Sequence, residues 1–244
     1  MTSSCLAHTI KEIGERIGSI KSMADEKKPR IKVTKNGPYI VTGGVPLSKQ
    51  IVVSDAKGDP LEWRTGRQYP AQETYALCRC GKSGNKPFCD GTHQQVNFDG
   101  TETANNTPYL QKARKTEGPE LTLTDCEELC VGAGFCDRDA GTWSLVENSH
   151  NPEAKKIAIE EGQNCPSGRL VVWDKAGQPQ EPQYEPSIGL MEDPGTGVVG
   201  PILVRGGIPI ESAGGTVYEK RNRVTLCRCG KSGNKPFCDG RHKI

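Results

Sequence analysis

The sequence has 244 residues, of which only 34% are hydrophobic and 5% aromatic, so one large domain or about two to three small ones with modest cores are expected. Its 32 Lys and Arg residues nearly balance 30 Asp and Glu residues, which disfavours a nucleic-acid partner held by phosphate neutralisation. No apolar run approaches the ~20 residues of a membrane helix, and the start of the sequence lacks the apolar core of a secretion signal. We therefore expect a cytoplasmic protein without a membrane span.

Near the start of the sequence an apolar residue recurs every three or four positions, which predicts an amphipathic helix within residues 1–28. Such a helix either docks on the body of the protein or makes a short dimer interface. The apolar positions are Leu6, Ile10, Ile13, Ile17 and Ile20.

The 11 cysteines are odd in number and no export signal is expected, which disfavours a disulfide framework and favours metal binding. Cys5 stands alone and is expected to be a free thiol. The others form three groups: Cys78, Cys80 and Cys89; Cys126, Cys130, Cys136 and Cys165; and Cys227, Cys229 and Cys238.

Two of these groups belong to an internal repeat. Residues 77–93 and 226–242 differ only at Thr92 and Arg241, and an upstream Gly-Pro segment that begins at Gly37 recurs at Gly200. The Gly-Pro segments are 163 residues apart and the cysteine motifs 149, so the first copy carries 14 extra residues, which we place within Ser48–Pro70. Two copies of a small β-rich unit, at 29–98 and 196–244, predict a pseudo-two-fold arrangement in which each copy buries its apolar face on the other.

Each repeat supplies four donors, in the pattern C-x-C-x8-C-x3-H. The Cys-x-Cys segment should place two thiolates on one side of a tight turn. The Asp-Gly pair after the last Cys predicts a helix start that puts this Cys and the His on one helical face. Two donor pairs suit a two-iron cluster with one pair per iron, and the alternative is a structural zinc site. The donors are Cys78, Cys80, Cys89 and His93 in the first copy and Cys227, Cys229, Cys238 and His242 in the second.

Both motifs resemble the CDGSH iron–sulfur domain family, the mitoNEET-like proteins. The resemblance implies a [2Fe–2S] cluster in each copy, with the two spaced cysteines on the inner iron and the last cysteine and the histidine on the outer iron. It also implies an α+β fold in which two modules share a β-sandwich, usually by dimerisation and here within one chain. The serine of the family motif is Thr92 in one copy and Arg241 in the other, and this position is not a ligand.

A histidine ligand is neutral where thiolate is anionic, so it raises the reduction potential of a cluster. Because imidazole also titrates, we hypothesise that His93 and His242 set both the potential and the acid lability of their sites. His8 and His150 have no such context and are expected to be ordinary surface histidines.

Between the repeats, residues 105–178 read as a small α+β module, followed by a linker at 179–195. The alternation of Leu121 to Thr124 predicts a strand, Asp125 is placed to cap a short helix, and Asn151-Pro152 predicts the start of a longer helix. A second short strand is expected at Arg169–Trp173.

The cysteines of this insert resemble those of the divergent single-cluster ferredoxins, which use C-x5-C and a remote Cys-Pro. Cys130, Cys136 and Cys165 match, whereas Ala133 stands where a bacterial ferredoxin has its middle cysteine. The resemblance implies a third cluster, [3Fe–4S] with these three ligands or [4Fe–4S] with Cys126 as the fourth. The alternative is a module that keeps the fold without a cluster.

The sequence therefore favours an iron–sulfur protein that transfers electrons to or from a redox partner protein. No nucleophile elbow, phosphate loop or dinucleotide fingerprint is present, so an enzyme is not expected. Two other classes stay open: a protein that donates clusters to an apo-acceptor or senses redox state and pH, and a zinc-stabilised interaction module. We expect a monomer with an internal pseudo-dimer, or a dimer through the N-terminal helix.

Overall fold

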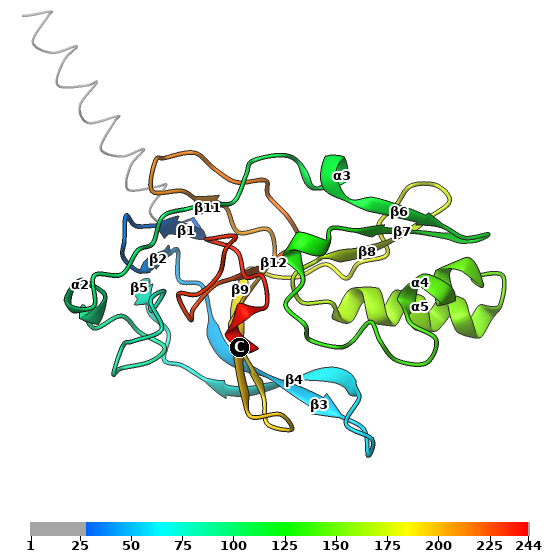
Figure 1. Ribbon diagram of the computed structural model, residues 1–244, viewed down its shortest axis with the longest axis horizontal. Coiled ribbons are helices and arrows are strands. Elements are labelled where there is room, and N and C mark those ends of the chain that lie inside the picture. Colours follow the sequence, from blue (N-terminus) through cyan, green and yellow to red (C-terminus); the bar gives the residue numbers. More distant parts are fainter. Residues whose placement is uncertain (1–27, 244) are drawn as a thin grey trace, which may run out of the picture.

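The computed structural model describes residues 28–243, in which two β-sheets share one apolar core (Figure 1). The order of the first sheet is β11-β1-β2-β5 and that of the second is β12-β10-β9-β3-β4. The first sheet contains β1 (Arg30–Val33), β2 (Tyr39–Thr42), β5 (Thr74–Leu77) and β11 (Ile210–Glu211). The second contains β3 (Leu47–Ser54), β4 (Pro60–Gln68), β9 (Ser187–Asp193), β10 (Val198–Arg205) and β12 (Arg223–Leu226).

The two repeats exchange strands. β11 of the second repeat runs parallel to β1, with Ile210 opposite Ile31, and β3 of the first repeat runs parallel to β9, with Leu47 opposite Ile188. Each repeat thus completes the sheet of the other. The predicted α+β fold, with two modules that share a sandwich around a pseudo-two-fold axis, is confirmed.

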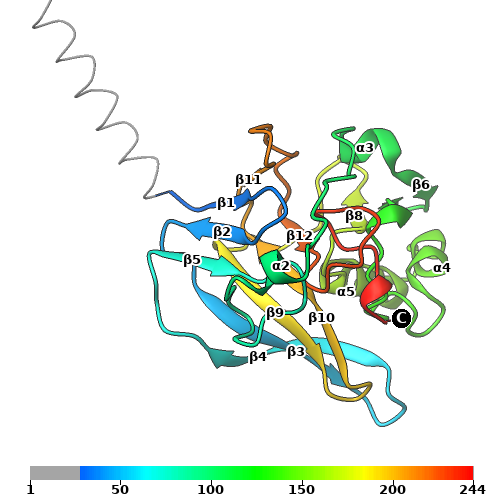
Figure 2. The ribbon, with the colours of Figure 1, turned by 60° about the vertical axis from the view of Figure 1, so that its left-hand side comes forward.

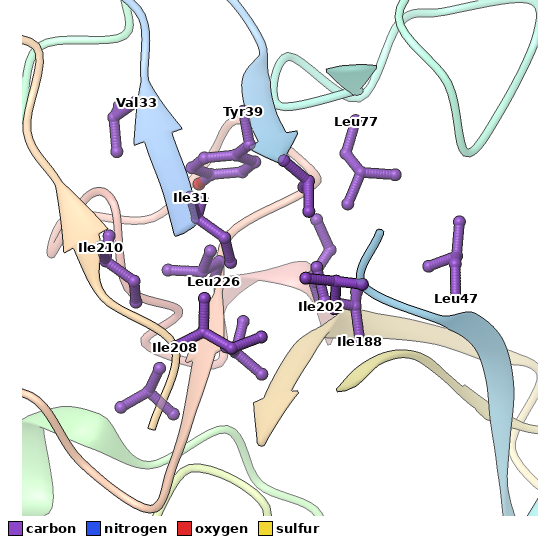
Figure 3. Packing of buried hydrophobic residues seen from close by; sticks show 14 of the residues in the cluster. Ile31, Val33, Tyr39, Leu47, Leu77, Ile188, Ile202, Ile208, Ile210 and Leu226 are labelled. Atoms are coloured by element: carbon purple, nitrogen blue, oxygen red, sulfur yellow. The ribbon is translucent and has the colours of Figure 1, made fainter. Parts of the chain in front are cut away.

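Alternating burial explains how the shared core forms. In β1 the exposed and buried residues alternate, as expected for a strand with one face on a core. Ile31 and Leu77 of the first repeat meet Ile202 and Leu226 of the second, and each side chain is at most 1% exposed (Figure 3). Burial of one such side chain contributes about 1.5–3 kcal/mol. This core fixes β5 and β12, the strands that lead directly into the two cysteine motifs.

The 14 extra residues of the first repeat lengthen the hairpin of β3 and β4, as predicted. In the second repeat the equivalent segment is only β11 with a single bridge from Glu211 to Val217. The long hairpin reaches the insert, where the Trp63 ring lies 4.8 Å from that of Phe135 and its Nε1 donates to Asn164 O at 3.0 Å. The lengthened hairpin therefore packs on the insert and holds it against the sandwich.

The insert is a separate α+β layer. Its antiparallel sheet has the order β6-β7-β8, and two helices cover one face of that sheet (Figure 1). Asn151 caps the longer helix by accepting from Glu153 N at 2.9 Å, and Pro152 is its first residue, as predicted. The elements are α3 (Tyr109–Lys112), β6 (Arg114–Glu117), β7 (Leu121–Asp125), η1 (Glu127–Leu129), α4 (Thr142–Glu147), α5 (Pro152–Asn164) and β8 (Leu170–Asp174).

Two local predictions were wrong. Asp125 does not cap η1; its carboxylate instead accepts from Arg169 Nε at 2.6 Å and from the Trp143 indole at 3.2 Å, because it ends β7 facing those side chains. Residues 179–195 are not only a linker, since β9 lies within them and is largely buried. The Pro, Gln and Glu residues just before β9 obscured its short apolar run. The helix predicted within residues 1–28, together with Cys5 and His8, lies outside the described residues.

Candidate metal centres

The first cysteine motif is a loop that folds back onto β5. Cys78 N donates to Pro87 O at 2.8 Å and Cys89 N donates to Ala76 O at 2.9 Å, so the ladder of the sheet continues into the motif. The Sγ atoms of Cys78 and Cys80 lie 3.8 Å apart, and Cys89 Sγ lies 3.3 Å from His93 Nδ1. The four donors therefore come together as two pairs.

The second motif repeats this geometry at the end of β12. The Sγ atoms of Cys227 and Cys229 lie 3.7 Å apart, and Cys238 Sγ lies 3.3 Å from His242 Nδ1. Cys238 N donates to Thr225 O, the counterpart of the bond to Ala76. Among residues 28–243, no three His, Cys, Asp or Glu side chains are close enough together to hold a single metal ion.

The last Cys and the His meet through a turn rather than along one helical face, which corrects the sequence expectation. Helix α2 (Thr92–Gln95) begins after Cys89, and η2 (Arg241–Lys243) of the second copy is a single 3₁₀ turn. The Asp90 carboxylate holds the turn by accepting from Thr92 N at 3.0 Å and from Gly84 N at 2.7 Å. A hydrogen bond from the Thr92 hydroxyl contributes most to lowering the pKa of Asp90, and the bonds from Thr92 N and Gly84 N lower it further.

The ionisation of the donors fits ligands of a cationic iron–sulfur centre. Burial raises the pKa of Cys238 to about 12 and also raises that of Cys80, so these thiols stay protonated in the absence of metal and release their protons when a metal binds. The hydrogen bond between Cys227 and Cys229 lowers the pKa of the first thiol and raises that of the second. Burial, together with Lys243 and Arg228, lowers the pKa of His242 and keeps its imidazole neutral. Soft thiolates in pairs with a neutral imidazole suit a two-iron cluster.

The two motifs touch each other through their glycines. A Cβ on Gly81 would lie 2.7 Å from Cys229 O, and a Cβ on Gly230 would lie 2.8 Å from Cys80 O. Both glycines also have positive φ angles, 75° and 80°, which L side chains rarely adopt. The Cys-x-Cys-Gly loops can therefore pack backbone to backbone across the pseudo-two-fold axis only because glycine follows each pair.

The insert contains a third candidate centre. A cavity of about 90 Å³ is lined by Cys130, Cys136 and Cys165, and Ala133 lines it as well. Burial raises the pKa of Cys136 to about 12, and the neighbouring Asp137 and Cys165 raise it further. The three cysteines expected as ligands are thus brought together at one cavity.

Cys126, the fourth ligand considered for the [4Fe–4S] alternative, lies elsewhere. It is 2% exposed and packs with Tyr109, Leu129 and Val171, outside the cysteine cavity. Sequence reasoning missed Arg169, which lines this cavity. Its guanidinium donates to Asp125 at 2.6 and 2.9 Å and stacks on Trp143, so it holds a positive charge beside the thiols.

The insert packs against the second motif. Val131 is buried in one cluster with Cys238, and Lys243 Nζ donates to Gly132 O. A Cβ on Gly240 would lie 3.1 Å from Cys130 O, whereas no atom of residues 28–243 lies within 4 Å of a Cβ on Gly91, the equivalent glycine of the first motif. Figures 1 and 2 show this contact, with the C-terminal segment (red) between the sandwich and the insert.

Sequence reasoning also missed Tyr39. Its hydroxyl donates to Cys227 O at 2.8 Å and lies 3.0 Å from Pro236 O, so the first repeat supports the loop of the second motif. The equivalent residue of the second repeat is Ile202, which has no hydroxyl. A comparison of the two Gly-Pro segments could have revealed this difference.

The paired thiols and imidazoles are donors typical of an iron–sulfur protein, and comparison with known families agrees. Residues 36–94 and 199–243 match the iron-binding zinc finger of CDGSH type, and residues 116–175 match the divergent 4Fe-4S mono-cluster family. The chain therefore contains two CDGSH-type iron-binding regions that flank a divergent 4Fe-4S mono-cluster domain. No curated protein matches the sequence. Within the described residues, no helix is both long and apolar enough to cross a membrane.

Proposed function

We propose that this chain transfers single electrons between redox partner proteins through two [2Fe–2S] clusters and one [3Fe–4S] cluster. Such clusters, when bound, supply reversible one-electron oxidation and reduction. The proposed ligands of the first are Cys78, Cys80, Cys89 and His93, those of the second are Cys227, Cys229, Cys238 and His242, and those of the third are Cys130, Cys136 and Cys165.

The observation that carries the proposal is the direct contact between the three sites. The loop of the insert that contains Cys130 packs on Cys238 and Gly240 of the second motif. The second motif in turn meets the first where Gly81 and Gly230 face the opposite Cys-x-Cys loops. Because electron exchange falls off steeply with distance, sites joined by adjoining backbone are well suited to pass electrons within one chain.

Three thiolates at the insert favour a [3Fe–4S] cluster. Ala133 lines the cavity where a middle cysteine would stand, and Cys126 packs elsewhere. Arg169 offsets part of the negative charge of the thiolates, and Phe135, 1% exposed, keeps water from one wall of the cavity. These residues support a site with three thiolate ligands that is partly shielded from water.

A second function, donation of a cluster to an apo-acceptor protein, is favoured by one observation at the first motif. Cys89 is partly exposed, whereas its counterpart Cys238 is buried, and in the described part of the chain no atom lies within 4 Å of a Cβ on Gly91. A thiol of an acceptor can therefore approach the Cys89–His93 pair more easily than the Cys238–His242 pair.

Metal analysis tests the leading proposal. Iron, acid-labile sulfide and zinc are counted per chain in anaerobically purified protein, and an EPR spectrum is recorded on the same sample. The proposal expects about seven irons and a [3Fe–4S] signal. About four irons would leave the insert without a cluster, and two zinc ions without sulfide would exclude both iron sites.

Repeated redox cycling separates the two functions. An electron carrier should keep its visible absorption through many cycles of chemical reduction and reoxidation. A cluster donor should instead lose the absorption within minutes when an apo-ferredoxin is added. The matched variants Cys89→Ser and Cys238→Ser indicate which motif supplies any transferred iron.

A further inference from the structure

The insert covers the outer face of the second sheet, which is the face that points away from the shared core. Leu203 on β10 is 0% exposed and packs with Val131 of the insert. Arg223 on β12 is 2% exposed, and its guanidinium donates to Gly162 O and to Cys165 O, both at 2.6 Å. This contact therefore combines an apolar centre with a buried cation that binds the carbonyls at the end of α5.

The equivalent face of the first sheet is exposed. By the repeat, Leu203 corresponds to Ile40 on β2, which is partly exposed, and Arg223 corresponds to Thr74 on β5, which is exposed. The first sheet and the insert lie on opposite sides of the molecule (Figures 1 and 2). The side chains of this first-sheet face alternate along the strands with those of the core, and they are Arg30, Lys32, Ile40, Thr42, Thr74 and Ala76.

The adjoining edge of the first motif is exposed in the same way. At the second motif, Asn234 is partly buried, and its Nδ2 donates to Glu128 O of the insert at 3.4 Å. Its counterpart Asn85 is exposed. Residues 77–91 and 226–240 have the same sequence. The first motif therefore offers to solvent the same side chains with which the second motif contacts the insert.

Two occupants from the chain itself fit the first-sheet face poorly. The insert of a second copy has its docking loop already seated on its own second motif. Residues 1–27 carry a predicted apolar stripe of Leu and Ile residues, whereas Ile40 is the one large apolar side chain of the first-sheet face, whose other members are Thr, Ala, Arg and Lys. These considerations favour a separate protein as the occupant.

We propose that the first-sheet face and the adjoining edge of the first motif dock a separate protein with a single-cluster ferredoxin domain like the insert. This partner lies on the first motif as the insert lies on the second. A polar face with one apolar residue suits the small and transient interfaces of redox proteins. The inference rests on the proposed function, because it names the redox partner for that electron transfer and places it at the first motif.

Isothermal titration calorimetry on the iron-loaded full chain, with both proteins oxidised, tests the docking. The probe is a purified ferredoxin of the divergent 4Fe-4S mono-cluster family. The control is a plant-type [2Fe–2S] ferredoxin of the same net charge, whose cysteine spacing differs. We expect one mono-cluster ferredoxin to bind per chain, and the control to bind at least about tenfold more weakly. Equal binding of both, or no binding of the first at millimolar concentration, overturns the proposal.

Two isoleucines that each lie opposite a cation provide matched variants. Ile40 lies opposite Lys32 on the first-sheet face, and Ile51 lies opposite Arg64 on the hairpin of β3 and β4. Ile40→Glu should weaken binding of the mono-cluster ferredoxin about tenfold, because it puts a charge where the partner makes its apolar contact. Ile51→Glu should leave binding unchanged. Equal weakening by the two variants refutes the location.

A gain of binding tests whether the partner docks in the orientation of the insert. Thr74→Arg supplies the counterpart of Arg223, whose planar fork binds the carbonyls at the end of α5. It should tighten binding of the mono-cluster ferredoxin about threefold. Thr74→Lys adds the same charge without the fork and should tighten binding much less. Equal effects of the two variants refute an orientation like that of the insert.

Other occupants of the first-sheet face give different results. A dimer of the chain that Ile40→Glu dissociates would show that a second copy covers the face, which refutes the proposal. Binding of the ferredoxin only after removal of residues 1–27 would show that this segment covers the face, which refutes it as well.

Stopped-flow absorbance measurements of electron passage to the same ferredoxin keep the docking site separate from the proposed function. Docking that Ile40→Glu weakens, without electron passage, supports the docking site and refutes the electron-transfer function. Electron passage that Ile40→Glu leaves unchanged, without measurable docking, supports the function and refutes the docking site.

Discussion

Replacing Tyr39 by Phe removes one buried hydroxyl with which the first repeat supports the second motif. The hydroxyl donates to Cys227 O at 2.8 Å and lies 3.0 Å from Pro236 O. Burial raises the pKa of Tyr39 well above its ordinary value, so the hydroxyl keeps its proton throughout the neutral range. The variant keeps the aromatic ring and its packing, so the change is confined to these contacts.

The expected loss of stability follows from the hydrogen bonds that the two carbonyl groups keep in the variant. Pro236 O still accepts from Cys227 N at 2.9 Å, whereas Cys227 O loses the Tyr39 hydroxyl. One unsatisfied buried carbonyl costs about 1–3 kcal/mol, so we expect the free energy of unfolding to fall by about 1–2 kcal/mol. Because Ile202 takes the equivalent place in the second repeat, the first motif should be unaffected.

Urea unfolding and iron release to a chelator measure the two effects. Tyr75→Phe is the matched control, because the Tyr75 hydroxyl donates to Val45 O at 2.8 Å, away from both motifs. Both variants should be destabilised, but only Tyr39→Phe should accelerate iron release, and only for about half of the iron held by the two motifs. Equal acceleration in both variants, or none in either, would refute the reasoning.

Three further predictions follow from the site geometry. Ala133→Cys adds a thiol to the cavity of Cys130, Cys136 and Cys165, so it should raise the iron content of the insert from about three to about four and abolish the [3Fe–4S] EPR signal; an unchanged spectrum would contradict the three-thiolate site. Gly240→Ala and Gly91→Ala strain similar backbones, with φ 84° and 89°, but only the first brings a methyl group to 3.1 Å from Cys130 O. Gly240→Ala should therefore lower the free energy of unfolding in urea by about 1 kcal/mol more than Gly91→Ala. Equal losses of stability would argue against the docked insert. Burial raises the pKa of Glu161 to about 7, above its unfolded value near 4.5, so the folded state binds this proton more tightly and stability should fall as pH rises between these values. Glu161→Gln should therefore be more stable than the wild type by roughly 1–3 kcal/mol at pH 8 and lose that advantage toward pH 5, and a constant difference across this range would show that Glu161 is not the group involved.

Much of the fold could be predicted because the chain repeats itself. The two nearly identical motifs predicted two equivalent donor sets, and the repeated Gly-Pro segment predicted a pseudo-two-fold arrangement of the two copies. The shared sandwich was implied by the resemblance to the CDGSH family. Asn151-Pro152 predicted the start of α5, since capping depends on a few adjacent residues. These features are local or duplicated, so the pattern of residues is sufficient to find them.

What the sequence did not predict depends on which surfaces meet. Gly91 and Gly240 stand in nearly identical sequences, but only Gly240 lies against the insert. Asp125 has the residue type of a helix cap and is used instead as the partner of Arg169, which is 44 residues away in the chain. Tertiary packing determines these contacts, and a local sequence pattern does not predict it.

The exchange of β3 and β11 has a consequence for how the chain folds. Residues on β1 pair with β11 about 180 positions later, and β3 pairs with β9 about 140 positions later, so the sandwich has a high contact order. During synthesis the sheet edges of the first repeat remain unpaired until the ribosome has made both the insert and the second repeat. Exposed strand edges of this kind favour association between nascent chains. The small insert, whose own core joins α4 and α5 to β7 and β8, is the part able to fold during that interval.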